Sequence, residues 1–71
     1  MSGSVYRVTE VIGTSSESWE AAAANAVATA AGTVRDLRVA EVMRQDVTIE
    51  NGAITSFRVR LALSFKYETG D

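Results

Sequence analysis

Oxygen-bearing side chains recur at alternate positions just before an Asn-Gly pair. Asp46, Thr48 and Glu50 are spaced by two residues, and Asn51 follows them directly. Alternate side chains of a β-strand leave the same face, so these oxygens would stand in one row. Calcium takes about six to eight oxygen ligands, usually including carboxylates. The row is therefore a candidate calcium site without an EF-hand loop. The alternative is that Asp46 is a solvated strand residue or the ion-pair partner of an arginine.

The composition excludes several other chemistries. The 71 residues include no histidine and no cysteine, which excludes disulfides, thiolate zinc sites and histidine-based catalysis. There is no Gly-rich phosphate loop, and Ser15 and Ser16 read as helix-cap residues with no base nearby in sequence, so we expect no enzymatic activity. The net charge of −2 argues against nucleic-acid binding, which needs a basic stripe. No apolar run approaches the roughly 20 residues of a membrane span, and residues 1–4 are too short for a signal peptide. We therefore expect a cytoplasmic protein with no membrane partner.

The elements that would position these side chains include a long strand predicted over residues 53–67, where apolar and polar residues alternate. From residue 56 onward, Ala62 is the one apolar residue at the otherwise polar positions, so the pattern is that of a half-buried strand. Such a strand would reach roughly 50 Å, whereas a typical strand has about five or six residues. It must therefore curve around something, run into a neighbouring subunit, or both. We expect one domain over residues 1–71, and a domain this small without disulfide or metal staples often gains stability by oligomerising.

A first strand and a helix cap precede it. Residues 5–12 are rich in β-formers with mixed faces, and Gly13 is expected to end the strand. Either Thr14 or Ser15 would then cap a helix, with Glu17 three residues after Thr14 as in a capping box.

The helix is predicted over residues 16–34. It has one nearly all-alanine face, with spacings of three and four, on which Trp19 is the one large residue. A tryptophan in such a stripe is expected to be a core residue rather than a ligand-stacking one. The small side chains should let the helix approach a sheet closely.

A second strand over residues 37–50 is joined to the last strand by a hairpin. Asn51-Gly52 predicts a two-residue type I′ turn, so that Glu50 pairs with Ala53 and paired residue numbers sum to 103. The face expected to receive the helix carries Ala40, Val42, Arg44 and Asp46 opposite Leu63, Leu61, Val59 and Phe57. The other face carries Val39, Glu41, Met43 and Gln45 opposite Ser64, Ala62, Arg60 and Arg58. A β-bulge would shift this register.

The element order β-α-β-β predicts an α+β fold with the first strand beside the last and the helix on one face. The second face would stay uncovered, which suggests a subunit contact or a ligand site between subunits. Its mixed patch of Glu41, Gln45, Arg58 and Arg60 is interpreted as an inter-subunit salt-bridge network or a ligand site. Arg58 could also hold an anion such as phosphate through its planar fork.

The chain resembles the dodecin family over about residues 5–68. The resemblance is carried by the Gly13-Thr14-Ser15 turn, the alanine-rich helix led by Trp19, the Val39-Ala40-Glu41-Val42 segment, the short hairpin and the alternation from Phe57 to Phe65. It implies a three-stranded antiparallel sheet wrapped partly around one helix. It also implies twelve subunits assembled into a hollow homododecamer, which would explain strands too long for one subunit.

The resemblance also implies where a ligand would bind. Dodecins typically bind pairs of flavins at subunit contacts on the helix-free side of the sheet, using a tryptophan that stacks and a glutamine that hydrogen-bonds the ring edge. These positions correspond here to Val39 and Arg58, which the register places on one face with Glu41 and Gln45. Valine has no aromatic face, whose stacking adds about 0.5–1.5 kcal/mol, and no other aromatic residue of this register lies there. Both replacements argue against flavin binding.

The chain looks closer to a branch of dodecins associated with calcium. It shares with that branch the Ser18-Trp19 pair, Val39-Ala40 and Gln45-Asp46. Three hypotheses follow: a homo-oligomeric shell that binds or sequesters a small ligand or ion, with calcium the named candidate; a flavin-storage dodecin with an altered site; and a structural assembly without a ligand.

Overall fold

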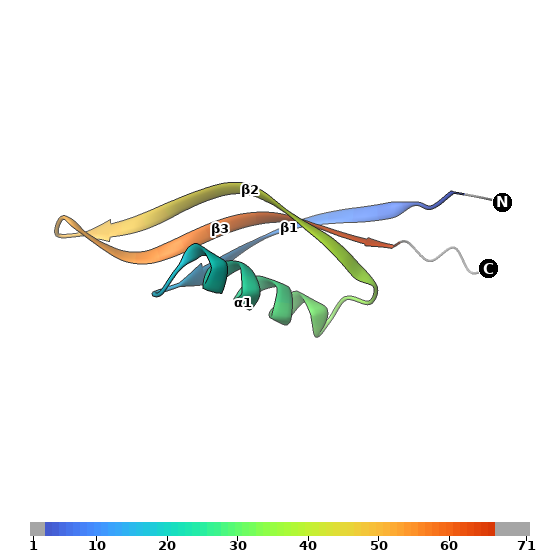
Figure 1. The fold of residues 1–71 in the computed structure, drawn as a ribbon, viewed down its shortest axis with the longest axis horizontal. Coiled ribbons are helices and arrows are strands. Elements are labelled where there is room, and N and C mark those ends of the chain that lie inside the picture. The colour runs from blue at the N-terminus through green and yellow to red at the C-terminus, as the bar shows by residue number, and fades with distance from the viewer. Residues whose placement is uncertain (1–2, 67–71) are drawn as a thin grey trace.

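The computed structural model describes residues 3–66, which form three strands and one helix (Figure 1). The elements are β1 (Tyr6–Ser15), α1 (Trp19–Ala31), β2 (Leu37–Glu50) and β3 (Ala53–Lys66). The sheet order is β1-β3-β2, and both neighbouring pairs are antiparallel. The β-α-β-β order and the place of the first strand beside the last are therefore confirmed. Tyr67, the end of the predicted last strand, lies outside the described residues.

The core lies between α1 and the facing side of the sheet. Ala22, Val59, Leu61 and Leu63 form its buried cluster. The partly buried hydrophobic residues packed against it are Val11, Trp19, Ala23, Ala26, Val27, Ala30 and Leu37. The predicted alanine stripe is thus the packed face of the helix, and Trp19 contacts the core as expected.

Gly13 allows this close packing and does not end the first strand. A Cβ atom added to Gly13 would lie 2.8 Å from the Cβ of Ala26 and still closer to the carbonyl oxygen of Ala22. The residue pairs with Val59 inside the sheet, and β1 continues to Ser15. The prediction of a strand end at Gly13 is wrong because this glycine makes room for the helix rather than a turn.

The helix is shorter than residues 16–34, and its cap is neither Thr14 nor Ser15. Ser18 is the N-cap, and its hydroxyl accepts a hydrogen bond from the Ala21 N–H at 3.0 Å. Ser15 instead accepts one from the Glu17 N–H at 3.0 Å, within the turn that leaves β1. Because β1 uses residues 14 and 15, the chain needs residues 16–18 to turn from the sheet to the helix.

The hairpin has the predicted turn but a different register. Asn51 and Gly52 have φ values of 51° and 77°, and Glu50 pairs with Ala53. A bulge then adds one residue to β3, so that Thr48 pairs with Ser56, until a second shift between Val42 and Arg44 restores the predicted pairing. The predicted register is therefore right from Val39 to Val42 and at the turn, and wrong from Arg44 to Thr48.

The molecule is elongated, with principal extents of 56 × 20 × 14 Å. The strands curve over α1, and the β2–β3 hairpin continues well beyond the helix (Figure 1). The long strands thus do extend past the packed core, as their length predicted. No helix within residues 3–66 is long and apolar enough to cross a membrane.

Candidate functional site

The helix-free side of the sheet, here called the open face, carries most of the predicted site residues. The strand pairing places on it Tyr6, Val8, Glu10, Ile12 and Thr14 from β1; Ser56, Arg58, Arg60, Ala62, Ser64 and Lys66 from β3; and Val39, Glu41, Arg44, Asp46 and Thr48 from β2. The row around Ser64 is apolar at both edges, the middle rows are charged, and the rows nearest the hairpin carry hydroxyl groups.

Of the residues at the family flavin position, three lie on the open face and one does not. Val39, Glu41 and Arg58 are there as predicted, whereas Gln45 pairs with the buried Val59 and therefore belongs to the helix side. The extra residue at the bulge is Met43, which reverses the side on which Gln45 and Asp46 emerge.

One aromatic side chain does lie on the open face, contrary to the hairpin register. Tyr6 of β1 pairs with Lys66 and is 46% exposed. It lies one row from Val39, because Val8, Ser64 and Val39 form the adjacent row. The register of the hairpin alone could not show it, because Tyr6 belongs to the third strand.

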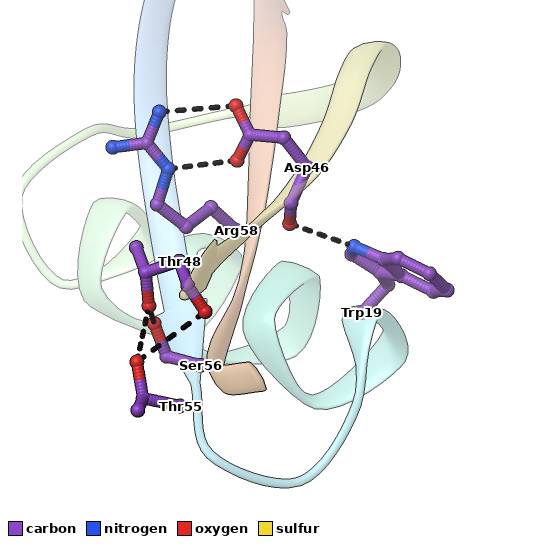
Figure 2. A network of polar contacts seen from close by, with 6 residues as sticks. All are labelled: Trp19, Asp46, Thr48, Thr55, Ser56 and Arg58. Atoms are coloured by element: carbon purple, nitrogen blue, oxygen red, sulfur yellow. Dashed lines mark hydrogen bonds and ion pairs between the residues drawn. The ribbon is translucent and has the colours of Figure 1, made fainter. Parts of the chain in front are cut away.

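Asp46 and Arg58 form a two-point ion pair across β2 and β3 (Figure 2). Arg58 donates from Nε to Oδ1 of Asp46 at 2.7 Å and from Nη2 to Oδ2 at 3.0 Å. These hydrogen bonds lower the pKa of Asp46, against the desolvation that would raise it, with smaller contributions from the charges of Arg58 and Arg44. The same contact raises the pKa of Arg58. Asp46 is therefore an arginine partner, the alternative noted for it from the sequence.

Asp46 also links the open face to the helix. Its backbone carbonyl accepts a hydrogen bond from Nε1 of Trp19 at 3.1 Å (Figure 2). The Trp19 ring also meets Phe57 edge-on, with a centroid separation of 5.2 Å. The tryptophan is thus a packing and hydrogen-bonding residue of the core side, and its ring is not on the open face.

Thr48 lies beside this pair in a cluster of hydroxyl groups (Figure 2). Its Oγ1 shares hydrogen bonds with Oγ1 of Thr55 at 2.7 Å and with Oγ of Ser56 at 2.6 Å. Thr55 is the residue that the bulge adds to β3. Thr55 Oγ1 also donates to the Thr48 carbonyl at 3.3 Å.

Glu50 ends β2 and is exposed. Because the bulge adds its residue to β3, the alternation of β2 continues unbroken, and Asp46, Thr48 and Glu50 lie on one side of that strand as predicted. Within residues 3–66, however, no three acidic side chains gather closely enough to hold a metal ion.

The middle of the open face contains two charged residues that the sequence reasoning left out of the site. Glu10 accepts a hydrogen bond from Nε of Arg60 at 2.9 Å. Arg44, which was expected on the helix side, pairs directly opposite Arg60. A shallow depression of about 50 Å³ lies here, lined by Ile12, Arg44, Asp46, Arg58 and Arg60. Glu10 could have been found from its even position in β1, whereas the bulge that moves Arg44 has no signal in the hydrophobic pattern.

A second, larger hollow lies on the helix side, between α1 and strands β1 and β3. Its volume is about 490 Å³, and none of its lining residues is charged. Its apolar lining includes Val11, Ala26, Ala30, Val34, Leu63 and Phe65.

Comparison with known proteins identifies relatives that cover most of the chain. A family model described as Dodecin matches residues 5–68. The chain is 48% identical to the calcium dodecin of Mycobacterium tuberculosis over 63 residues, which cover 89% of each protein.

Solved structures agree with this match. The dodecin from Streptomyces coelicolor has a TM-score of 0.90 and 41% identity, covering 99% of this chain and 100% of that one. A crystal structure of the M. tuberculosis protein, described as a calcium dodecin with a novel calcium-binding site, has a TM-score of 0.80 and 46% identity, covering 96% of this chain and 97% of that one. The antiparallel three-stranded sheet and single helix implied by the resemblance are thus confirmed, and the chain belongs to the dodecin family.

Proposed function

We propose that the chain assembles with copies of itself into a hollow shell of twelve subunits, which binds or sequesters calcium rather than flavin and acts by binding, not catalysis. The observation that carries the proposal is the altered flavin position on the open face. Val39 stands where a stacking ring would be needed, and the donor fork of Arg58 is held by Asp46 at 2.7 and 3.0 Å. The 48% identity to a protein described as calcium dodecin supports calcium as the ion.

The calcium ligands are proposed to come from more than one copy of the chain. Calcium takes about six to eight oxygens, and one copy gathers no three acidic side chains within its described residues. The Asp46 carboxylate is already engaged by Arg58. Glu50 and the Thr48 hydroxyl cluster remain the candidates on β2, and a shell would bring such groups of neighbouring copies together.

Native mass spectrometry of the purified protein, followed by addition of CaCl2, MgCl2 and flavin mononucleotide in turn, tests this function. We expect a twelve-subunit mass with calcium increments and none for flavin. Calcium should also raise the melting temperature in a way that magnesium does not reproduce, since a ligand at about 100 times its Kd stabilises the folded state by about 2.7 kcal/mol. A monomer of 7.6 kDa under all conditions would refute the assembly. An assembly that binds no calcium would refute calcium as its ligand.

A second candidate is a flavin-binding dodecin with an altered site, favoured by the position of Tyr6. Its exposed ring lies one row from Val39 on the open face, where it offers an aromatic surface. Quenching of flavin fluorescence by the wild-type protein, lost in Tyr6→Ala, would support this candidate over calcium. An assembly indifferent to flavin and to calcium would leave a purely structural shell.

A further inference from the structure

Two oppositely charged side chains on β2 make no ion pair within residues 3–66. Glu41 and Arg44 are both exposed, and neither takes part in the ion pairs Asp36–Arg38, Asp46–Arg58 and Glu10–Arg60. Every other charged residue in the three middle rows of the open face has a partner across the strands. Glu41 and Arg44 are therefore a negative and a positive charge without an ion-pair partner among the described residues, and both lie on the edge strand β2.

Neither charge has an opposite charge directly across the strands in an isolated copy, although Arg44 lies near enough to Asp46 to help lower the pKa of that carboxyl. Glu41 pairs opposite Ala62, whose other neighbour is Glu10, so two carboxylates flank one alanine. Arg44 pairs directly opposite Arg60. Like charges at directly opposed positions destabilise a sheet, and this applies to Arg44 opposite Arg60, whereas Glu41 has the uncharged Ala62 opposite it. Each of the two side chains lacks an ion-pair partner and would gain from an opposite charge supplied by another molecule.

The bulge at Met43 puts both charges on the same face. Residues three apart on a regular strand leave opposite faces. Because Met43 is the extra residue, Glu41 and Arg44 both pair with open-face positions of β3, Ala62 and Arg60. Between them lies Met43, which is 51% exposed, and Val39 at 55% exposure continues the apolar surface on the other side of Glu41.

This arrangement is self-complementary. A two-fold axis midway between Val42 and Met43 exchanges the position of Glu41 with that of Arg44. In a two-fold contact, residue i of one copy meets residue j of the other and the reverse also holds. A second copy so placed supplies two ion pairs at once, and it covers apolar side chains that are half exposed in a single copy.

We propose that residues 39–44 of β2 form a two-fold contact between copies of the chain, in which Glu41 of each copy pairs with Arg44 of the other. The proposal rests on the proposed function, because it names a contact through which the shell would assemble. A free anion in the depression next to Arg44 would neutralise that arginine, but it would leave Glu41 beside Glu10 without a partner. The second copy satisfies both charges.

Single and mixed charge reversals test the contact, with all samples in EDTA and without phosphate so that calcium and small anions play no part. Glu41→Arg alone and Arg44→Glu alone should each weaken assembly by roughly tenfold or more, because each replaces two attractive pairs per contact by two repulsive ones. Mixing the two purified variants should restore assembly. Across such a mixed contact, the two cationic positions of a Glu41→Arg copy would face the two anionic positions of an Arg44→Glu copy. Glu17→Arg, an exposed reversal outside the sheet, is the matched control and should assemble like wild type.

Each result has a distinct meaning. Far-UV circular dichroism of each single variant and of their mixture shows whether the mixture regains the secondary structure of the wild type. Unimpaired assembly of Glu41→Arg or Arg44→Glu, or failure of the mixture to recover, would overturn the contact while leaving the shell intact. A wild-type protein that stays monomeric both in EDTA and with added CaCl2 would instead refute the proposed function. Wild-type assembly that depends on added phosphate and survives Glu41→Arg would assign the neutralising charge to an anion.

Discussion

At the scale of single residues, the open face differs from a flavin site because position 58 carries an arginine that is paired with Asp46. A glutamine at position 58 would have a neutral amide for a flavin edge, whereas Arg58 carries a charge that Asp46 meets at two points. Such two-point pairs fix the planar guanidinium in direction. Asp46 is fixed in turn by the Trp19 hydrogen bond to its carbonyl. Within one copy, the guanidinium of Arg58 and the carboxylate of Asp46 therefore engage each other.

Two substitutions on the open face are expected to create flavin binding. Val39→Trp supplies a stacking ring worth about 0.5–1.5 kcal/mol beyond its buried area, and Arg58→Gln supplies an uncharged donor and acceptor. We expect the double variant to quench flavin mononucleotide fluorescence in titration and the wild type not to do so. Val39→Trp alone should bind more weakly than the double variant, because Arg58 remains tied to Asp46. Equal quenching by wild type and double variant would contradict this interpretation.

The Asp46–Arg58 pair also predicts a pH dependence of stability. The pKa of Asp46 is lowered from 3.8 by the Arg58 hydrogen bonds, so the folded state favours the ionised carboxylate. The resulting stabilisation is present above the unfolded-state pKa and is lost as the pH falls through the lower folded-state pKa. We expect urea unfolding of Asp46→Asn to show a smaller fall in the free energy of unfolding than wild type below pH 3.8.

The effect should be small and reduced in high salt, because both side chains are partly exposed, at 42% for Arg58 and 40% for Asp46. Identical acid profiles for Asp46→Asn and wild type at low salt would show that the pair adds nothing to stability.

At the scale of elements, the hydrophobic period predicted every strand and the helix. It did not predict the bulge that changes the face of the sheet on which the following side chains lie. The bounds of β2 and the I′ turn at Asn51-Gly52 follow directly from composition and φ requirements. The bulge at Met43 does not, because its neighbours Val42 and Arg44 fit a regular alternation equally well. One unpredicted residue therefore moved Asp46 and Arg44 to the open face and Gln45 away from it.

The helix ends show the same limit. Thr14, Ser15, Ser16 and Ser18 all have capping oxygens, and only the length of β1 decides that Ser18 is used. That length depends in turn on Gly13 being covered by the helix, which is a tertiary contact and not a local propensity. Sequence reasoning therefore located the capping region within a few residues but could not select the cap.

Packing of α1 on β1 predicts that Gly13 tolerates no side chain. Gly13→Ala would bring a Cβ to 2.8 Å from the Cβ of Ala26 and closer still to the Ala22 carbonyl, so the helix must move off the sheet. Overpacking of this kind costs about 1–3 kcal/mol. The measurement is the free energy of unfolding in urea.

Gly32→Ala is the matched control for this prediction. Gly32 has a φ of −73°, and the atom nearest to a Cβ added there is the carbonyl oxygen of Thr29, at 3.4 Å. Because the conformation suits an L residue, alanine should be neutral or stabilise by about 0.4–1 kcal/mol. If both alanine variants unfold alike, the close approach of helix and strand at Gly13 is not a determinant of stability.

At the scale of the whole molecule, one copy has little core for its length. Within residues 3–66 only Ala22, Val59, Leu61, Ala62 and Leu63 are buried hydrophobic residues. By contrast, large side chains more than half exposed are Val5, Val8, Ile12, Val39, Val42, Met43, Ile49 and Ile54. They are spread over the strands and the hairpin of a body 56 Å long. A sheet that exposes this much apolar surface is stabilised when other copies cover it.

Folding and assembly should therefore be one coupled transition, and stability should depend on protein concentration. If twelve unfolded chains form one shell, a tenfold rise in concentration stabilises each chain by about 1.3 kcal/mol, close to the 1.4 kcal/mol that corresponds to a factor of ten. For a chain of this size that corresponds to a rise in melting temperature of roughly 5–10 °C. Scanning calorimetry over a hundredfold range of concentration measures it. Glu17→Arg should show the same slope, and a melting temperature that stays constant would mean that the single copy folds on its own small core before any assembly.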